Sequence, residues 1–478
     1  MIALKSTSPV YSSASDSISA DGSVQQSHYS ARAYLAGIGA KIRALNIFEP
    51  ITRKVKIDQK TVEDSPTEKL YDGFIGMLCG AKGMVEVNKL VRSDKGLQQA
   101  FGRKRCAEQS VIQETLDASN AENVQQMEAA MDEIYRLHGQ GYQHNYTEAI
   151  QVLDVDMTGQ PCGPKADFAT KGYFAGKRNR RGRQRGRVLV TGYNEIIVER
   201  VYDGKVQLTK ALQPLIQATA QTLEIDGAPD KRARTLVRVD SGGGSQDDVN
   251  WLLNQGYLVL TKDYSTLRAR KFAKSVVHWI DDPRHEGRQV GVVTTPASEY
   301  DHPVVRIAVR CRKNNKQWGY GLLITNLIPG DIAVLTSVEP TFLEDPAALW
   351  LAYIYCYDQR GGGVETSFKQ DNQALKIKKR NKKRFAAQQM LTQLEVLAHN
   401  VLVWAQQWLT SEKPVLKQIG FVRLLRDVFT TTGELCFNQL GRLVEIQLNA
   451  ADTLVRPWIQ GLSDLLFSEH VAVNLGQT

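Results

Sequence analysis

The chain contains 478 residues, 42% of them hydrophobic, with 60 Lys and Arg against 51 Asp and Glu. This length can hold two to four folding units, and the apolar fraction is large enough to bury a core, which excludes a wholly disordered chain. The formal charge of +9 favours a polyanionic partner, although a merely basic soluble protein has the same balance.

Cysteine usage and hydropathy bear on the compartment. The six cysteines are scattered without a Cys-x-x-Cys pair, which is typical of a reducing cytosol rather than of a zinc ribbon or a disulfide framework. The sequence contains no apolar run long enough to span a bilayer, and its start lacks the apolar core of a signal peptide. We therefore expect a cytoplasmic protein with no membrane partner.

The N-terminal third divides into two parts. Residues 1–64 are expected to be a flexible segment, because the first thirty or so are rich in serine and lack apolar periodicity. Residues 65–145 are predicted to be helical, since Val124, Met127, Met131 and Ile134 recur at steps of three and four. The short glycine-broken helices before them are typical of a helix-turn-helix DNA reader or, equally, of a small packing domain. We expect a helical DNA-binding domain here.

Residues 146–410 predict an α/β fold. The stretch 146–265 contains strands that first pair antiparallel and then alternate with helices, which favours a mixed sheet flanked by helices. Residues 266–340 are expected to be a β-rich insertion, with strands in VVRIAVRCR, WGYGLLITN and DIAVLTSVE. The sheet domain resumes over 341–410, where a long buried helix is predicted with Glu365 at or near its start. Residues 411–478 form a C-terminal region for DNA binding or dimerisation.

Two acids lie in one predicted strand, VLDVDMT. Asp154, Asp156 and Thr158 share a face because strand side chains alternate, and the apolar residues occupy the other face. Carboxylates in an apolar strand are costly unless something compensates them, and a bound cation would do so. Solvated acids at a strand edge are the alternative.

Two further acids lie at the ends of predicted elements. Asp240 follows a strand and precedes glycines 242–244, at the kind of position where open α/β sheets bind ligands and where glycine lets a phosphate approach. An Asp that merely starts a turn is the alternative. Glu365 follows Tyr357 and Arg360, so that its carboxylate could hold a metal ion while Tyr357 and Arg360 lie near a phosphate.

The chemistry that would need three acids is phosphodiester cleavage or transfer. Two divalent ions about 3.5–4 Å apart can clamp the attacking and leaving oxygens in line. Mg²⁺ prefers oxygen ligands and keeps several waters, so two or three carboxylates suffice, and Mn²⁺ is expected to substitute.

Two basic runs fit a nucleic-acid substrate, although a charged run is more often a solvated face. They cover residues 176–187, interpreted as a glycine-rich loop, and residues 376–384. The DNA-binding candidates of the first run are Arg178, Arg180, Arg181, Arg183 and Arg185.

The segments LDVDMT, VRVDSGGGS and YDQRGGGVE, in that order, resemble the three motifs of the DDE transposases of bacterial insertion sequences. The chain is similar to the branch with a Tyr-x-x-Arg…Glu signature and a β-rich insertion, over about residues 65–460. The resemblance implies an RNase H-like core in which Asp156, Asp240 and Glu365 are the catalytic metal ligands. Asp156 is preferred to Asp154 because the family commonly has a Thr two residues after its first Asp.

The resemblance also implies DNA partners and a location in a bacterial cytoplasm, associated with the nucleoid when bound to DNA. It predicts cleavage and strand transfer on double-stranded DNA, at terminal inverted repeats and at a target, by a homodimer in a synaptic complex. Tyr357 and Arg360 match signature residues that contact DNA near the cut. The chain departs from the signature in having four residues between Arg360 and Glu365, and in placing Asn372 where the family has a lysine; Lys369 and Lys376 flank that position. An RNase H-like endonuclease that does not join strands, and a catalytically inactive DNA-binding relative, are the alternatives.

Overall fold

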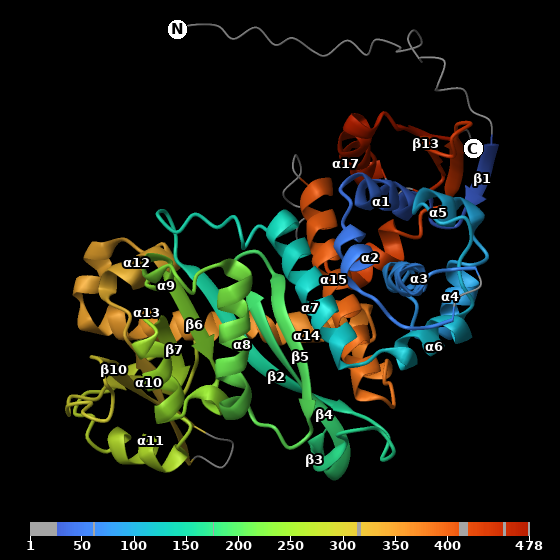
Figure 1. Cartoon of the computed structure of the whole chain (residues 1–478). Coiled ribbons are helices and arrows are strands. Elements are labelled where there is room, and N and C mark those ends of the chain that lie inside the picture. Colours follow the sequence, from blue (N-terminus) through green and yellow to red (C-terminus); the bar gives the residue numbers. More distant parts are fainter. Residues whose placement is uncertain are drawn as a thin grey trace, which may run out of the picture.

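The computed structural model describes residues 26–60, 63–174, 176–312, 317–410, 419–452 and 456–476. Two lobes lie side by side in Figure 1, one built on a ten-stranded sheet and the other on helices from both ends of the chain. The predicted mixed α/β architecture is confirmed.

Five strands form the centre of the larger sheet, in the order β5-β4-β2-β6-β7. They are β2 (Gln151–Pro161), β4 (Lys177–Val190), β5 (Glu195–Asp203), β6 (Thr235–Val239) and β7 (Leu258–Lys262). Neighbours are antiparallel from β5 to β2 and parallel from β2 to β7. A run such as TLVRV can form β6 because every one of its residues is buried between two layers.

The strands expected in a separate insertion continue this sheet beyond β7. β11 (Trp318–Thr325) pairs with β7, followed by β10 (Val305–Arg312), β9 (Arg288–Val292) and β8 (Ile280–Asp281). At the opposite end, β3 (Thr170–Phe174) pairs with β4. The prediction of a strand in DIAVLTSVE is wrong, because most of this segment lies in helix α12 (Pro329–Thr336). The helix starts with a proline, and the Asp331 carboxylate accepts a hydrogen bond from the Ile328 N–H at 3.1 Å.

Helices cover both faces of the sheet. α8 (Leu208–Leu223) and α10 (Gln246–Asn254) pack on the face that carries Val155, Val239 and Val259. Figure 1 shows α8 in front of the strands and α14 (Val364–Ala374) behind them. α13 (Pro346–Asp358) packs with α12 on the opposite face, against Leu260 and Leu323. The short helix α9 (Pro229–Arg232) precedes β6, and α11 (Thr266–Ala273) packs against β10 and β11.

The second lobe combines the two ends of the chain around α15 (Phe385–Leu409), a largely buried helix of 25 residues. Its other helices are α1 (Ala33–Ala44), α2 (Glu49–Lys54), α3 (Pro66–Leu78), α4 (Val85–Leu90), α5 (Lys95–Ala100), α6 (Gln109–Ala118), α7 (Ala121–His138), α16 (Phe421–Arg423) and α17 (Arg456–Leu466). The predicted apolar face of α7 is confirmed by the burial of Val124, Met127, Met131 and Ile134.

A four-stranded sheet joins the N-terminal and C-terminal segments. It has the order β1-β12-β13-β14, with β1 (Gln26–Ser30), β12 (Gly433–Phe437), β13 (Leu443–Leu448) and β14 (Ala472–Leu475). The expectation that residues 1–64 are flexible is therefore wrong for the described part of this segment. Its apolar residues are covered partly by nearby helices such as α5 and α7 and partly by the other end of the chain, as in the hydrogen bond from the Tyr34 hydroxyl to the Trp458 carbonyl, with a separation of 424. Residues 1–25 lie outside the described part.

The structure of α1 predicts that the N-terminal segment contributes directly to stability. Leu35 is fully buried in α1, so Leu35→Ala should lower the free energy of unfolding by about 2–5 kcal/mol, because it removes apolar packing and leaves a cavity. Leu137→Ala is the matched control, since this helical leucine is 58% exposed and its truncation should cost less than about 1 kcal/mol. Urea unfolding measures both, and equal effects would contradict the assignment of residues 33–44 to the core.

Candidate active site

Strand register brings the first two acids together. The parallel pairing of β2 with β6 ends at Val155 opposite Val239, so Asp156 and Asp240 are the next residues on neighbouring strands. Neighbouring strands are about 4.8 Å apart. The two acids predicted from separate motifs therefore lie at the same edge of the parallel part of the sheet.

Asp154 shares the face of Asp156 but has a different environment. Its carboxylate is fully buried and accepts hydrogen bonds from Arg238 at 2.6 and 3.0 Å and from the Thr191 hydroxyl at 2.7 Å. These bonds compensate the buried charge without a metal ion. The side chain of Asp156 remains 18% exposed. The contacts leave Asp156, not Asp154, accessible to a ligand.

Asp240 caps a short turn, η1 (Ser241–Gly243). Its carboxylate accepts a hydrogen bond from the Gly242 N–H at 2.8 Å, so the turn-starting role is present. The glycines serve packing inside the protein: a Cβ on Gly244 would lie 1.8 Å from the Lys262 carbonyl oxygen, and one on Gly243 would lie 2.5 Å from Val239. The glycine run thus holds the Asp240 turn against β6 and β7.

Glu365 lies in the first turn of α14, and its side chain is 55% exposed. This corrects the expectation that Glu365 begins the long helix, because α14 ends at Ala374 and the long helix α15 starts at Phe385. A Cβ on Gly363 would lie 2.1 Å from an Asp154 carboxylate oxygen. Only glycine therefore allows α14 to begin this close to β2 and to place Glu365 near Asp156.

Arg360 connects two of the three acids. Its side chain is 5% exposed, and its guanidinium nitrogens lie 3.0 Å from Asp156 Oδ2 and 2.7 Å from Glu365 Oε1. A longer hydrogen bond of 3.4 Å reaches the Val155 carbonyl. The Nε of Arg360 is buried and has no hydrogen-bond partner within the described part of the chain. The guanidinium therefore occupies the space between β2 and the start of α14.

The charges of this cluster are strongly coupled. Burial raises the pKa of Asp156 to about 6, against the opposing effect of Arg360, and the negative charges of Asp240 and Glu365 push it in the same direction as burial. Burial disfavours the charge of Arg360, but Asp156 and Asp240 more than offset this and raise its pKa. The site is thus a desolvated group of acids stabilised by one internal cation.

Two further side chains complete the site, one of which the motifs did not indicate. Tyr357 is buried at 6% exposure, and burial raises the pKa of its hydroxyl. The Nζ of Lys262, the last residue of β7, lies 4.6 Å from the centre of the Tyr357 ring, and burial lowers the pKa of this lysine. The sequence feature that could have indicated Lys262 is its position at the end of β7, since β7 is parallel to β6, the strand that Asp240 follows.

An open cavity of about 370 Å³ lies beside the acids. Asp156 and Glu365 line it together with Lys369, Asn372 and Lys378. Lys369, one of the two lysines considered from the sequence, is exposed in this cavity. Lys376 is half-buried, with a left-handed backbone at φ 56°, and does not line it. Lys378, which the motifs did not indicate, is exposed and lines the cavity.

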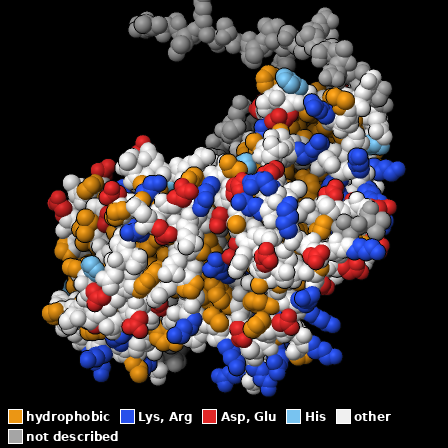
Figure 2. All heavy atoms as spheres, viewed as in Figure 1, with side chains coloured by type: hydrophobic (Ala, Val, Ile, Leu, Met, Phe, Trp, Pro, Cys, Tyr) orange, Lys and Arg blue, Asp and Glu red, His pale blue; other side chains and the backbone are white. Residues whose placement is uncertain are grey.

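The first basic run is a strand rather than a loop, and this divides its arginines. Residues 177–181 of β4 are exposed, including Arg178, Arg180 and Arg181, and Figure 2 shows Lys and Arg side chains gathered at the end of the molecule where β3 and β4 lie in Figure 1. Arg183 and Arg185 are fully buried. Arg183 donates to the Asp167 carbonyl at 2.7 Å, and Arg185 pairs with Glu199 and, at 2.7 Å, with Glu395. The structure does not support their assignment as DNA contacts, because these internal contacts bury both side chains.

The acids fit a divalent metal by chemistry but not by arrangement. All three offer carboxylate oxygens, the ligands that Mg²⁺ prefers. Within the described residues, however, no group of three or more His, Cys, Asp or Glu side chains is placed to hold a metal ion. Arg360 lies between Asp156 and Glu365 instead. In this conformation the site is therefore a carboxylate–arginine cluster.

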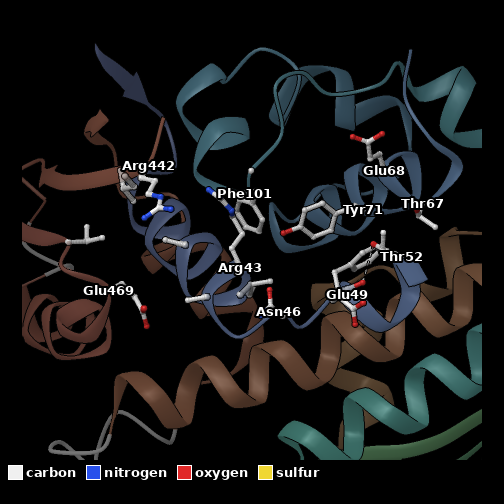
Figure 3. A pocket seen from close by; sticks show the side chains of 17 residues that line it. Arg43, Asn46, Glu49, Thr52, Thr67, Glu68, Tyr71, Phe101, Arg442 and Glu469 are labelled. Carbon is white, nitrogen blue, oxygen red and sulfur yellow. Dashed lines mark hydrogen bonds between the residues drawn. The ribbon is translucent and has the colours of Figure 1, made fainter. Parts of the chain in front are cut away.

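Elsewhere in the described residues, the structure contains a larger cavity. A cavity of about 560 Å³ lies in the second lobe among α1, α2, α3 and β13. Figure 3 shows Tyr71 and Phe101 near its middle, with Glu469 toward one end and Glu68 toward the other. Its charged residues have both signs and include none of the predicted site residues. In the described ranges, no helix combines the length and apolar character of a membrane span.

Comparison with known proteins gives a distant structural likeness. No family model matches the chain, and no curated protein matches its sequence. A solved structure, the piggyBac transposase synaptic complex with hairpin DNA, is similar with a TM-score of 0.41 and 14% sequence identity, covering 85% of this chain and 83% of the other. A likeness this distant does not identify the function of the chain, which has to be inferred from its own residues.

The environment of Asp156 predicts a pH dependence of stability. Its pKa is higher in the folded protein, about 6, than the ordinary value of 3.8, so the folded state binds this proton more tightly. Stability linked to Asp156 is therefore present below pH 4 and disappears as the pH rises through 6. Between pH 4 and pH 7 the wild type should lose on the order of 2–3 kcal/mol relative to Asp156→Asn. Urea unfolding across this range measures the difference, and a constant difference would contradict it.

Proposed function

We propose that this chain is a DDE-type DNA transposase that cuts DNA and joins the released strand to a target. The observation that carries the proposal is the convergence of Asp156, Asp240 and Glu365 around Arg360, from three separate motifs and three separate elements. A structural role alone does not explain why three acids should gather at one edge of the sheet, two of them lining a half-open cavity, rather than pair individually in the core.

The strand order supports an RNase H-like core for this site. Three antiparallel strands, β5, β4 and β2, are followed across the sheet by the parallel strands β6 and β7. α8 connects β5 to β6, and α10 connects β6 to β7. In this arrangement the first acid lies on the central strand, the second follows its parallel neighbour and the third lies on a helix packed behind them.

The proposed substrate is double-stranded DNA, both at the terminal inverted repeats of a mobile element and at a target. Exposed cations lie at residues 177–181 of β4 and at Lys369 and Lys378 beside the cavity. Such cations bind phosphates without reading bases. A homodimer would supply two such sites, one for each end of the element.

The acids have two roles in this proposal. They would take up Mg²⁺, for which Mn²⁺ can substitute, and this cofactor would supply the electrostatic stabilisation that phosphodiester chemistry needs. Because their negative charges lie close together, they would also repel a phosphate unless a cation lies between. Lys262 and Tyr357, whose side chains pack against each other, would lie near the reacting DNA backbone.

The exposed part of β4 is predicted to bind the DNA backbone. Replacing Arg178, Arg180 and Arg181 together by alanine should weaken binding to all duplexes and flatten the salt dependence by about one unit for each phosphate that is no longer neutralised. The fold should survive, because these side chains are exposed. Arg185→Ala should behave differently and destabilise the protein by about 3–5 kcal/mol, since it leaves the buried Glu395 without its arginine partner and removes one of the two arginines that pair with Glu199. Unchanged salt dependence in the triple variant would contradict the assignment.

Catalysis and DNA binding are predicted to be separable at the acids. Asp156→Asn, Asp240→Asn and Glu365→Gln should each reduce cleavage by roughly three orders of magnitude, or about 4 kcal/mol, while leaving DNA binding equal or slightly tighter. The matched control is Asp247→Asn, an exposed acid on α10 that should keep full cleavage. The measurements are cleavage of labelled duplexes from the DNA bordering the reading frame, binding to them, and the melting temperature.

The same experiment separates the alternatives. Cleaved ends without joined product would indicate an RNase H-like endonuclease. Binding without cleavage in Mg²⁺ or Mn²⁺ would indicate a catalytically inactive DNA-binding relative. Near wild-type cleavage by all three acid variants would refute the DDE mechanism for this chain.

A further inference from the structure

Arg360 is the internal cation of the acid cluster. Its guanidinium contacts Asp156 and Glu365 at 3.0 and 2.7 Å, and it is almost completely buried. A divalent ion that used both carboxylates would have to lie next to this guanidinium, where like charges repel strongly because the surroundings are desolvated. Metal uptake and the present position of Arg360 therefore exclude one another.

The local structure allows Arg360 to leave. Its Nε is buried without a hydrogen-bond partner among the described residues, so this position does not satisfy the guanidinium completely. Gly361 and Gly362 follow it in the short turn η3 (Gln359–Gly362), are exposed, and have open space where a Cβ would lie. Two consecutive unconstrained glycines permit the backbone changes that a hinge needs. The acids are thus blocked by a side chain on a movable turn.

A DNA phosphate offers Arg360 a replacement partner. The planar guanidinium binds phosphate in the same forked way as carboxylate. The cavity beside the acids is lined by Lys369 and Lys378, which favour the approach of a phosphate to this edge of the sheet. A phosphate here would draw Arg360 away from Asp156 and Glu365 and leave those carboxylates free.

We propose that Arg360 is an autoinhibitory counterion: in the free protein it neutralises Asp156 and Glu365 and blocks metal uptake, and DNA releases the block by binding its guanidinium. This inference rests on the function proposed above and adds its regulation. Because coupling between two ligands is reciprocal, DNA should tighten metal binding and the metal should tighten DNA binding by the same factor.

The test is Mn²⁺ binding to the full chain, measured by the electron paramagnetic resonance signal of free Mn²⁺, with and without a short DNA duplex. Without DNA, Arg360→Gln should bind Mn²⁺ about tenfold or more tightly than the wild type. The duplex should raise the Mn²⁺ affinity of the wild type by a similar factor but change that of the variant little. Lys369→Gln is the matched control, because it removes one charge from the same cavity without freeing the acids, and its Mn²⁺ affinity should stay within about threefold of the wild type.

A second variant protects the test against misfolding, since removal of Arg360 leaves two acids unpaired. Arg360→Lys keeps the charge but not the fork, and should show intermediate Mn²⁺ affinity and reduced coupling to DNA. Equal Mn²⁺ affinity of the wild type and Arg360→Gln without DNA would overturn the autoinhibition while leaving the proposed enzyme intact. Absence of Mn²⁺ binding in every protein, with and without DNA, would overturn both.

Discussion

Two arginines of β4 are buried among carboxylates that come from three other elements. Arg187 lies 2.7 Å from Glu199 on β5 and 2.7 Å from Asp371 on α14, and Arg185 pairs with Glu199 and Glu395. The Arg187 guanidinium also donates to the Ser367 hydroxyl at 2.7 Å and lies over the Phe368 ring. These bonds connect the sheet to the helices behind it, and they fix where α14 lies on the strands.

The position of the catalytic candidates depends on this network. Asp156 of β2 lies opposite Arg187 of β4 in the strand register. Arg187 contacts Ser367 and Phe368, and Glu365 lies within one helical turn of both. Asp371 is held from its other side by His399 of α15 at 2.8 Å, which extends the connection into the second lobe. Replacing a buried ion network by apolar residues can be neutral for stability, whereas breaking it is costly. Its geometric effect is to set the separation between the strand and the helix that carry the acids.

The proximity of the acids was easier to predict from the sequence than their surroundings. Asp156 and Asp240 lie in or directly after apolar runs typical of buried strands, and strand ends meet at a sheet edge, so their proximity was accessible from pattern alone. The burial of Arg183 and Arg185 could not be predicted from the sequence, because a dense run of arginines looks the same whether it is solvated or paired. One of the paired carboxylates lies 210 residues away. The same applies to α1, which is apolar on nearly all sides and is covered in part by α17 and β13 at the other end of the chain. Whether Asp156, Asp240 and Glu365 are catalytic stays a prediction.

The four-stranded sheet has a consequence for the order of folding. β1 is made about 400 residues before β12, the strand with which it pairs. At a synthesis rate of about 5–20 residues per second, β12 is made about 20–80 s after β1. Until then β1 and the face of α1 that packs on the C-terminal segments stay exposed. Pairings this distant form late, because the chain between them must be ordered first. The lobe that carries the acids is complete in sequence before β12 is made. The nascent chain therefore exposes apolar N-terminal surface during the period in which this lobe can fold.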